Sequence, residues 1–307
     1  MSSVAGSPPC ELRGPQGSGS PQRKRLQRLI SVSGCEPNRS NDLLLLPAEE
    51  AAGSGEERSL SRHLVFFHGD IQNFQEEMLL QPEAAQWLPW SLEQVALILA
   101  RRFPHRNIWV VRASRMYLHK FSCYQNFVES SPFGAPEHSA HGGALLQLRT
   151  LLTNAMERAK LPEPLRPAGG ADSIPPGFSL ILVGFSKGCV VLNQVAYELA
   201  AARADPKMSA FVDRISDMFW LDGGHPGGSE TWVTDRKVLM ELAACGVSIH
   251  AHVTPYEVLD PMRAWVGREY RHFIRTLEEL GACPSNKLHF EEEPPSIENH
   301  FRVLLEF

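Results

Sequence analysis

From residue 63 to the end of the chain, short apolar segments of strand length alternate with longer amphipathic segments of helix length. The predicted strands cover residues 63–67, 107–112, 178–184, 218–221, 247–253 and 287–290. The predicted helices cover residues 91–102, 144–159, the segment after Gly188, and residues 235–244, 262–280 and 298–305. A short edge strand is expected at residues 41–47. Strands that alternate with helices form βαβ units, so we expect an α/β fold with a mainly parallel sheet and helices on both faces.

One of these strand-to-helix junctions carries the pentapeptide Gly184-Phe185-Ser186-Lys187-Gly188. A buried strand, a sharp turn and a helix are the setting in which G-x-S-x-G forms a nucleophile elbow. The turn exposes the serine hydroxyl, and small neighbours allow the strand and helix backbones to approach closely. The alternative is an ordinary turn with a glycine-flanked serine at a helix N-terminus. We favour the elbow, which predicts an α/β-hydrolase-like fold with Ser186 as the nucleophile.

The order of residues along α/β-hydrolases is nucleophile, acid, histidine, and it constrains the other members of a triad. His300 follows the last predicted strand and is the expected base, against the alternative of a structural helix-end histidine. Asp260 follows the strand before it and is the expected acid, although Asp-Pro is also a helix N-cap pattern. Asp222, at the end of strand 218–221, is the alternative acid.

The oxyanion hole of this fold uses the backbone N–H of the residue after the nucleophile, here Lys187, and a second N–H from the loop after an earlier strand. That loop is His68-Gly69-Asp70-Ile71, so the second donor is expected to be the backbone of Asp70 or Ile71. A carboxylate beside an oxyanion is unfavourable, so the Asp70 side chain has to point away.

Two further segments are expected to line the site. Gly223, Gly224 and His225 follow Asp222 in a glycine-rich loop, where an alternative interpretation pairs Asp222 with His225 at a metal ion. We prefer the lining role, with no metal. Residues 112–143 form a long connection that carries Tyr117 and His119, and it is either a lid or substrate-recognition insertion or an ordered surface loop.

Composition excludes several classes of function. The chain has 307 residues, 43% of them hydrophobic, which is enough for one large core. The net charge of −5 gives no basic field, so we expect no nucleic-acid partner. No apolar stretch is long enough for a transmembrane segment. The six cysteines are widely spaced, which favours reduced thiols. No cofactor is predicted.

The first 35 residues differ from the rest in composition. They are rich in Ser, Gly and Pro and contain five Lys or Arg residues against one acid, Glu11. We expect residues 1–35 to be disordered, either as a mitochondrial transit peptide or as a plain tail. Residues 36–307 are then expected to form a single domain, with residues 112–143 as its insertion.

Several long segments resemble the chromosome 2 open reading frame 69 protein family, from about residue 36 to the end. The segments that carry the resemblance are Arg115–Tyr124, Phe133–His138, Gly184–Gln194, Trp220–His225 and Pro295–Val303. The resemblance implies a mitochondrial, α/β-hydrolase-like protein linked to respiratory-chain function.

Together, these observations lead to two hypotheses. The first is a serine hydrolase of the mitochondrial matrix that acts on an ester, thioester or amide through Ser186, His300 and Asp260, with a small-molecule or acyl substrate. The second is a hydrolase-fold scaffold without turnover that binds a mitochondrial protein partner.

Overall fold

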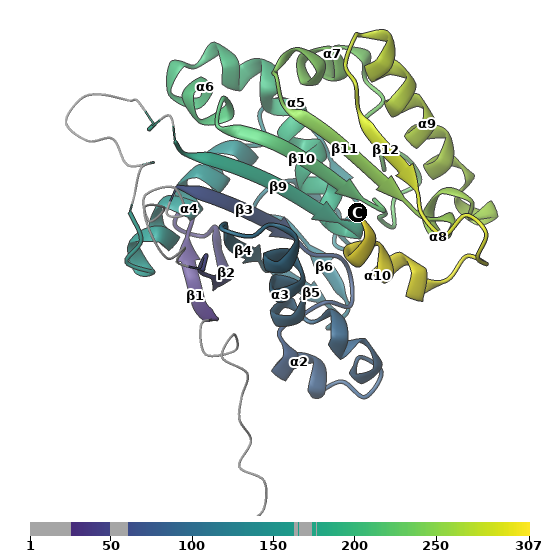
Figure 1. Cartoon of the computed structure of the whole chain (residues 1–307), viewed down its shortest axis with the longest axis horizontal. Coiled ribbons are helices and arrows are strands. Elements are labelled where there is room, and N and C mark those ends of the chain that lie inside the picture. The colour runs from purple at the N-terminus through teal and green to yellow at the C-terminus, as the bar shows by residue number, and fades with distance from the viewer. Residues whose placement is uncertain (1–25, 50–60, 163–164, 166–173, 176) are drawn as a thin grey trace, which may run out of the picture.

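The computed structural model describes residues 26–49, 61–162, 165, 174–175 and 177–307 (Figure 1). Within these residues, eight strands form one sheet. Their spatial order is β1 (Gln27–Ser33), β2 (Ser40–Leu46), β4 (Asn107–Val111), β3 (Arg62–Phe67), β9 (Ser179–Phe185), β10 (Ile215–Leu221), β11 (Ser248–Val253) and β12 (Ser285–Leu288). The pairs β1–β2 and β2–β4 are antiparallel, and all other neighbours are parallel. The predicted α/β-hydrolase-like class, with its mainly parallel sheet, is confirmed.

Helices cover both faces of the sheet. The helices of the described residues are α2 (Gln75–Leu79), η2 (Ala85–Trp90), α3 (Leu92–Arg102), α4 (Ala144–Arg158), η3 (Ser186–Gly188), α5 (Cys189–Ala204), α6 (Pro206–Val212), α7 (Arg236–Ala244), α8 (Pro255–Val258), η4 (Pro261–Arg263), α9 (Ala264–Glu279) and α10 (Ile297–Glu306). In the part of the chain described, no helix is long and apolar enough to cross a membrane.

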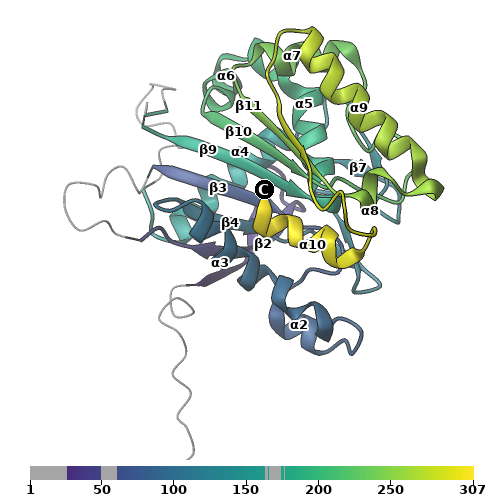
Figure 2. The same ribbon diagram turned by 45° about the vertical axis from the view of Figure 1, so that its right-hand side comes forward.

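Alternation along the strands explains the two layers of helices. In β9, Leu180 and Leu182 face one core, which includes apolar side chains of α4, α5, α7 and α9. Ile181 and Val183 point the other way, into a second core built with α3 and α10. Because successive strand residues point to opposite faces, a strand that is apolar throughout must be covered on both sides. Figure 2 shows α3 and α10 on the same face of the sheet.

The sheet begins earlier in the chain than the composition predicts. Strand β1 lies within the segment expected to be disordered, so that prediction is wrong from residue 27 onward, whereas residues 1–25 lie outside the described part. Leu29 and Val32 of β1 are buried against the core while its polar residues face outward. β1 also covers β2, so the segment expected to be an edge strand is an inner strand.

The insertion at residues 112–143 contains two small hairpins. They consist of β5 (Arg115–Tyr117) with β6 (Phe121–Cys123), and β7 (Glu129–Ser130) with β8 (Pro136–Glu137). The insertion begins at the carboxyl end of β4, so it leaves the sheet at the same edge as the turn after β9. Five cysteines in the described residues, Cys35, Cys123, Cys189, Cys245 and Cys283, are free thiols, in line with the cysteine spacing.

Candidate active site

The turn after β9 has the backbone geometry of a nucleophile elbow. Ser186 adopts a left-handed conformation with φ of 52°, which is strained for a residue with a side chain. A Cβ atom on Gly184 would lie 2.9 Å from the Cα atom of Cys189, and one on Gly188 would lie 1.9 Å from the carbonyl oxygen of Phe67. Both positions of the pentapeptide therefore require glycine, because backbone fills the space where a side chain would begin.

His300 is held by a buried carboxylate. Its Nδ1–H donates to Oδ2 of Asp222 at 2.6 Å. The Asp222 side chain is fully buried and also accepts the backbone N–H of Thr254 at 2.7 Å and the Thr254 hydroxyl at 2.6 Å. An ionised carboxylate can only accept hydrogen bonds, so Nδ1 carries the proton and Nε2 is left with a free lone pair. An imidazole in this tautomer is ready to take a proton from a hydroxyl.

The sheet register brings these groups to one edge. Leu221 pairs with Phe185, so Asp222 and Ser186 are the next residues along two adjacent parallel strands. The Gly224 N–H donates to the Ser186 carbonyl oxygen at 3.3 Å, and the Phe185 and His300 rings lie 4.7 Å apart. Within the described residues, the Ser186 hydroxyl makes no hydrogen bond, and the residue is 8% exposed. Hydrogen bonds between nucleophile and base often tighten only when substrate binds.

Asp260, the acid expected from the sequence, does not pair with His300. Its carboxylate accepts the Met262 backbone N–H and the Arg263 Nε–H, each at 2.8 Å, and it caps η4. The carboxylate that bonds His300 is instead that of Asp222, the alternative acid. The reason is local: helix α8 follows β11 directly and carries the chain past the sheet edge before Asp260 is reached.

The loop after β3 packs against the elbow, as the oxyanion-hole prediction requires. A Cβ atom on Gly69 would lie 2.7 Å from the Ser186 Cβ atom. The Asp70 carboxylate accepts the backbone N–H and the hydroxyl of Ser122, at 2.8 and 2.9 Å, so it is turned toward the insertion. Its backbone N–H has no acceptor in the described residues. The Ile71 N–H, by contrast, donates to the Lys120 carbonyl oxygen at 2.7 Å, so Ile71 is excluded as a free donor.

Lys187, the other expected donor, has its backbone N–H in the first helical turn, where such groups lack intrahelical partners. Its side chain is buried beneath the insertion, and Nζ donates to the Phe133 carbonyl oxygen at 3.4 Å. A Cβ atom on Gly134, which has a φ of 78°, would lie 2.9 Å from this Nζ. Burial lowers the pKa of Lys187. The insertion therefore covers the elbow on the side of Lys187.

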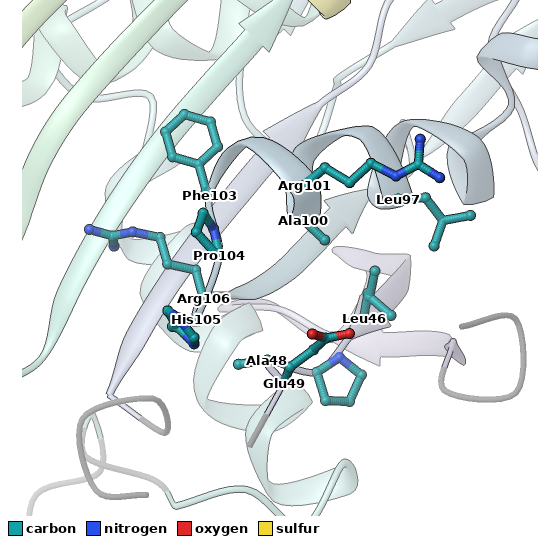
Figure 3. A pocket seen from close by; sticks show the side chains of 11 residues that line it. Leu46, Ala48, Glu49, Leu97, Ala100, Arg101, Phe103, Pro104, His105 and Arg106 are labelled. Atoms are coloured by element: carbon teal, nitrogen blue, oxygen red, sulfur yellow. The ribbon is translucent and has the colours of Figure 1, made fainter. Parts of the chain in front are cut away.

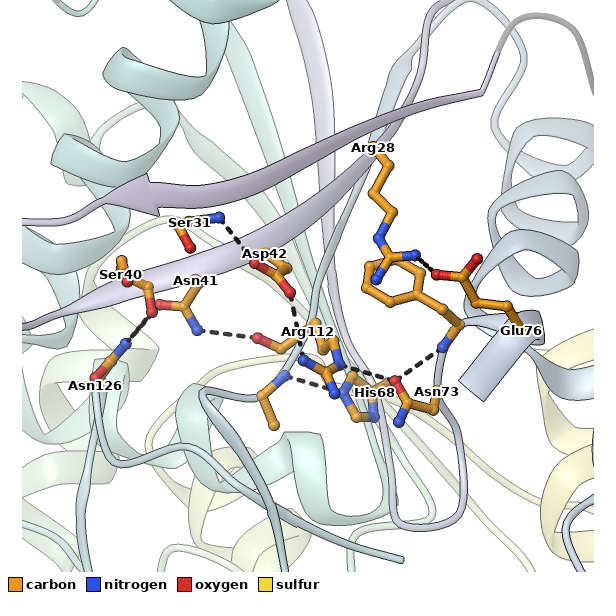
Figure 4. Close-up of polar contacts among 12 residues, drawn as sticks. Arg28, Ser31, Ser40, Asn41, Asp42, His68, Asn73, Glu76, Arg112 and Asn126 are labelled. Atoms are coloured by element: carbon orange, nitrogen blue, oxygen red, sulfur yellow. Dashed lines mark hydrogen bonds and ion pairs between the residues drawn. The ribbon is translucent and has the colours of Figure 1, made fainter. Parts of the chain in front are cut away.

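A polar network of buried and half-buried side chains fixes the loop that carries Asp70 (Figure 4). Nδ1–H of His68 donates to the Gly69 carbonyl oxygen at 2.7 Å, and its Nε2 accepts the Ala113 N–H at 3.0 Å. Burial lowers the pKa of His68 to about 4, which keeps this imidazole neutral. Arg112 donates to Asn73 at 2.8 Å and lies 3.3 Å from Asp42. These bonds join the loop to β2 and β4, so its backbone is pre-positioned.

The residues expected to line the site lie in two places. Gly223 packs on the Cys189 side chain. Gly224 lies over the Glu257 carboxylate, and a Cβ atom on Gly224 would lie 2.5 Å from Oε1 of Glu257. His225 is buried, its Nδ1 accepts the Gly227 N–H, and burial lowers its pKa to about 4. Its Nε2 has no partner in the described residues.

The insertion places the other two lining residues. Tyr117 packs edge-on against Phe133 with ring centroids 5.5 Å apart, and His119 lies at the tip of the β5–β6 hairpin. The contacts give no support to a metal between Asp222 and His225. The oxygens of Asp222 are engaged by Thr254 and His300, and no group of three metal-ligating side chains was found in the described residues.

Sequence reasoning missed three residues around His300. Thr254 holds Asp222, and the Tyr256 ring lies 5.0 Å from the His300 ring. Glu257 is buried and bonds Arg263 at 2.8 Å, and burial raises its pKa to about 7. The position of Thr254 could have been found from the sheet, because this residue directly follows β11, which pairs with β10. Nothing in the sequence marks Glu257.

A separate hollow of about 190 Å³ lies between the end of β2 and residues 97–106 (Figure 3). It is lined by Leu46, Phe103, Arg106 and their neighbours, at the amino ends of the parallel strands. None of the candidate site residues lines it, so it plays no part in the chemistry considered below.

Comparison with known proteins identifies relatives along most of the chain. The C2orf69 family model matches residues 28–166 and 166–283. "Mitochondrial protein C2orf69 homolog" of Danio rerio is 65% identical over 291 residues, which cover 92% of this chain and 85% of that protein. "Mitochondrial protein C2orf69" of Homo sapiens is 44% identical over 335 residues, covering 92% of this chain and 86% of that protein.

Solved structures with a similar chain trace have little sequence in common with this protein. A Bacillus cereus carboxylesterase has a TM-score of 0.43 and 12% identity, with 87% of this chain and 93% of that chain covered. A Mycobacterium tuberculosis puromycin-hydrolyzing peptidase has a TM-score of 0.46 and 13% identity, and this chain spans 38% of its length. The family model and the relatives at 44–65% identity show that this chain belongs to the C2orf69 family.

Proposed function

We propose that this protein is a serine hydrolase that cleaves an ester, thioester or amide. The observation that carries the proposal is the 2.6 Å bond between His300 Nδ1 and Asp222, at the sheet edge where Ser186 occupies a strained elbow. A buried, acceptor-only carboxylate fixes the imidazole with Nε2 free, which is the state that a base needs.

The proposed reaction has two steps. The Ser186 hydroxyl attacks the acyl carbon while His300 Nε2 takes the hydroxyl proton. The resulting oxyanion accepts hydrogen bonds from the backbone N–H groups of Lys187 and Asp70. His300 returns the proton to the leaving oxygen, sulfur or nitrogen, which leaves an acyl group on Ser186. A water molecule, deprotonated by His300, then releases the acid and regenerates the serine.

The proposal is tested by labelling of the purified protein with a fluorophosphonate, which reacts with activated serines. We expect the wild type to be labelled and Ser186→Ala to be unlabelled, with His300→Gln strongly reduced. Circular dichroism checks that each variant is folded. A folded wild type that resists the probe, or equal labelling of Ser186→Ala, contradicts the proposal.

The second candidate is a scaffold without turnover that binds a mitochondrial protein partner. Two observations favour it: Ser186 is only 8% exposed, and its hydroxyl makes no hydrogen bond in the described residues. Complementation of a respiratory defect distinguishes the two functions. Rescue by Ser186→Ala at normal protein level supports the scaffold, whereas loss of rescue supports the hydrolase.

We further propose that the protein acts in the mitochondrial matrix in support of the respiratory chain. The support is that the relatives are named mitochondrial proteins and that the residues before β1 contain four Lys or Arg residues against one acid, Glu11. Import into isolated mitochondria tests the location. The imported protein should resist protease after the outer membrane is ruptured, and digestion at that stage contradicts a matrix location.

A further inference from the structure

A groove of about 530 Å³ opens beside the candidate active site, and neither the triad nor the oxyanion hole accounts for it. Its half-buried floor is apolar and includes Ile71, Trp87 and Ile297, which pack on the second core. Its rim is exposed and mostly polar, and comprises Pro82, Glu83, Gln86, Leu118, His119 and Lys120. A volume of this size accommodates a small organic ligand.

The floor of the groove belongs to both halves of the candidate site. Ile71 follows Asp70 in the loop proposed to bind the oxyanion, and Ile297 lies one helical turn before His300 on α10. Trp87 stacks on Phe301, the neighbour of His300, with ring centroids 5.1 Å apart. A ligand in the groove therefore lies between the oxyanion loop and the helix that carries the base (Figure 2 shows α2 and α10 at the same end of the sheet).

The tip of the β5–β6 hairpin forms the outer wall under backbone strain. Leu118 and His119 both have left-handed conformations, with φ of 51° and 55°. This conformation is unfavourable for a leucine, and such strain is concentrated at ligand-binding sites. Leu118 is nevertheless 68% exposed, so no core contact explains its position. The Lys120 carbonyl oxygen accepts the Ile71 N–H at 2.7 Å and ties this wall to the oxyanion loop.

Exposed apolar side chains also directly precede one of the lining residues in the chain. Leu79 and Leu80, at the end of α2 and directly before the lining residue Gln81, are 57% and 73% exposed. The charged side chains on the rim, Glu83 and Lys120, have opposite signs, so the groove presents no field that selects an anion or a cation. An apolar floor with an open polar rim fits a linear aliphatic chain.

We propose that this groove binds the aliphatic acyl chain of the ester or thioester that Ser186 attacks, and so sets a preference for medium-chain acyl groups. The inference rests on the proposed function for its chemistry. The acyl C–O or C–S bond breaks, water supplies the hydroxyl of the released fatty acid, and the alcohol or thiol leaves with the proton. The chain itself is unchanged and only contributes binding.

Hydrolysis of p-nitrophenyl acetate and decanoate gives the first test. We expect kcat/KM to be higher for the decanoate, because each buried methylene strengthens binding about fourfold. Leu118→Asp, which keeps a left-handed turn feasible, should lower the decanoate-to-acetate ratio by about tenfold. Leu146→Asp is the matched control, because Leu146 is an equally apolar, 50% exposed residue on α4, and its ratio should equal the wild type. If the esters are hydrolysed without a chain-length preference, or with equal ratios in both variants, the inference is overturned.

Binding without turnover separates this inference from the proposed function. In Ser186→Ala, 10-bromodecanoate should quench tryptophan fluorescence saturably, because a bromine atom quenches an indole that it touches. The quenching should be lost in Ser186→Ala/Trp87→Phe. If no ester is hydrolysed but this quenching is found, the proposed function fails, whereas the assignment of an aliphatic chain to the groove stands. Absence of quenching in Ser186→Ala, or quenching that persists without Trp87, overturns the inference.

Discussion

The Asp222 carboxylate is surrounded by donors and sealed from water. Thr254 supplies two of these donors and His300 the third. A carboxylate with this set of partners cannot be replaced by an amide, because an amide nitrogen would face donors and leave them unpaired. The tautomer of His300 therefore depends on the charge of Asp222.

We predict that Asp222→Asn lowers kcat by about 10⁴-fold on any ester that the wild type cleaves. Asp260→Asn should change kcat less than twofold, because Asp260 bonds only η4 and Arg263 in the structure. Steady-state kinetics on the two variants tests this, with thermal unfolding as the check on folding. Similar losses in both variants would contradict the assignment of the acid.

Glu257 provides a second test at the residue scale, through pH. Burial raises its pKa to about 7 in the folded protein, above its ordinary value of 4.5. Below pH 7 the folded state binds the proton more tightly than the unfolded state does, so the group favours folding in acid and loses this contribution as pH rises through 7.

We therefore predict that the difference in unfolding free energy between Glu257→Gln and the wild type shifts in favour of the variant by about 2 kcal/mol from pH 5 to pH 8. The glutamine has no proton to lose, whereas the wild type must ionise a carboxyl beside Gly224 and Arg263. Urea unfolding at both pH values measures the difference. A difference that is the same at pH 5 and pH 8 would show that Glu257 is not buried as described.

At the scale of elements, the insertion combines a strained hairpin with a glycine that cannot be replaced. His119 has a φ of 55°, where glycine is more stable than a residue with a side chain. Gly134 already has a φ of 78° and lies against the buried Lys187 ammonium group. Glycine should therefore be the more stable residue at both positions, so that introducing it at 119 and removing it at 134 have opposite effects on stability.

We predict that His119→Gly raises the unfolding free energy by up to about 1 kcal/mol, whereas Gly134→Ala lowers it by at least as much. Thermal unfolding followed by circular dichroism shows whether each variant is more or less stable than the wild type. Because His119 lines the groove, the stabilised variant should also lose part of the chain-length preference. A destabilised His119→Gly would mean that the hairpin tip is not strained.

The elements that sequence predicted well are those whose pattern is local. The helices predicted at residues 91–102 and 235–244 are α3 and α7. Their first predicted residues, Ser91 and Asp235, are the N-caps, which accept the N–H groups of Gln94 and of Lys237 and Val238. The elbow at Ser186 is also visible, because its glycines and its flanking strand and helix lie within a few residues.

The features that were not predictable depend on contacts between distant segments. The choice between Asp222 and Asp260 is decided by which carboxylate the sheet brings to His300, 78 residues away from Asp222. Ile71 is lost as an oxyanion donor only because the hairpin at Lys120 takes its N–H. β1 was not predicted from the sequence because only two of its residues, Leu29 and Val32, are buried, which gives too little apolar pattern within a polar, basic segment.

For the molecule as a whole, four buried histidines and the half-buried His138 set the response to acid. Burial lowers the pKa of His68, His138 and His225 to about 4, that of His252 to about 3, and also that of His289. In the unfolded chain a histidine has a pKa of about 6.5. Between these values the unfolded state binds protons that the folded state does not, so stability falls as pH drops from 6.5 toward 4.

The contribution of these histidines to the pH dependence of stability is larger than that of Glu257, a single group that favours the folded state in acid. The fully buried His68 alone accounts for about 3 kcal/mol by pH 4, out of the 5–15 kcal/mol typical of a whole domain. We predict that the urea midpoint decreases steadily from pH 7 to pH 5 and that the protein unfolds without denaturant near pH 4. Tryptophan fluorescence reports the transition, and the Cε1 protons of the buried histidines should show no titration in the folded state above pH 5. A constant or rising midpoint over this range would mean that these imidazoles are accessible to water, and the network around His68 that fixes the Asp70 loop would then lose its basis.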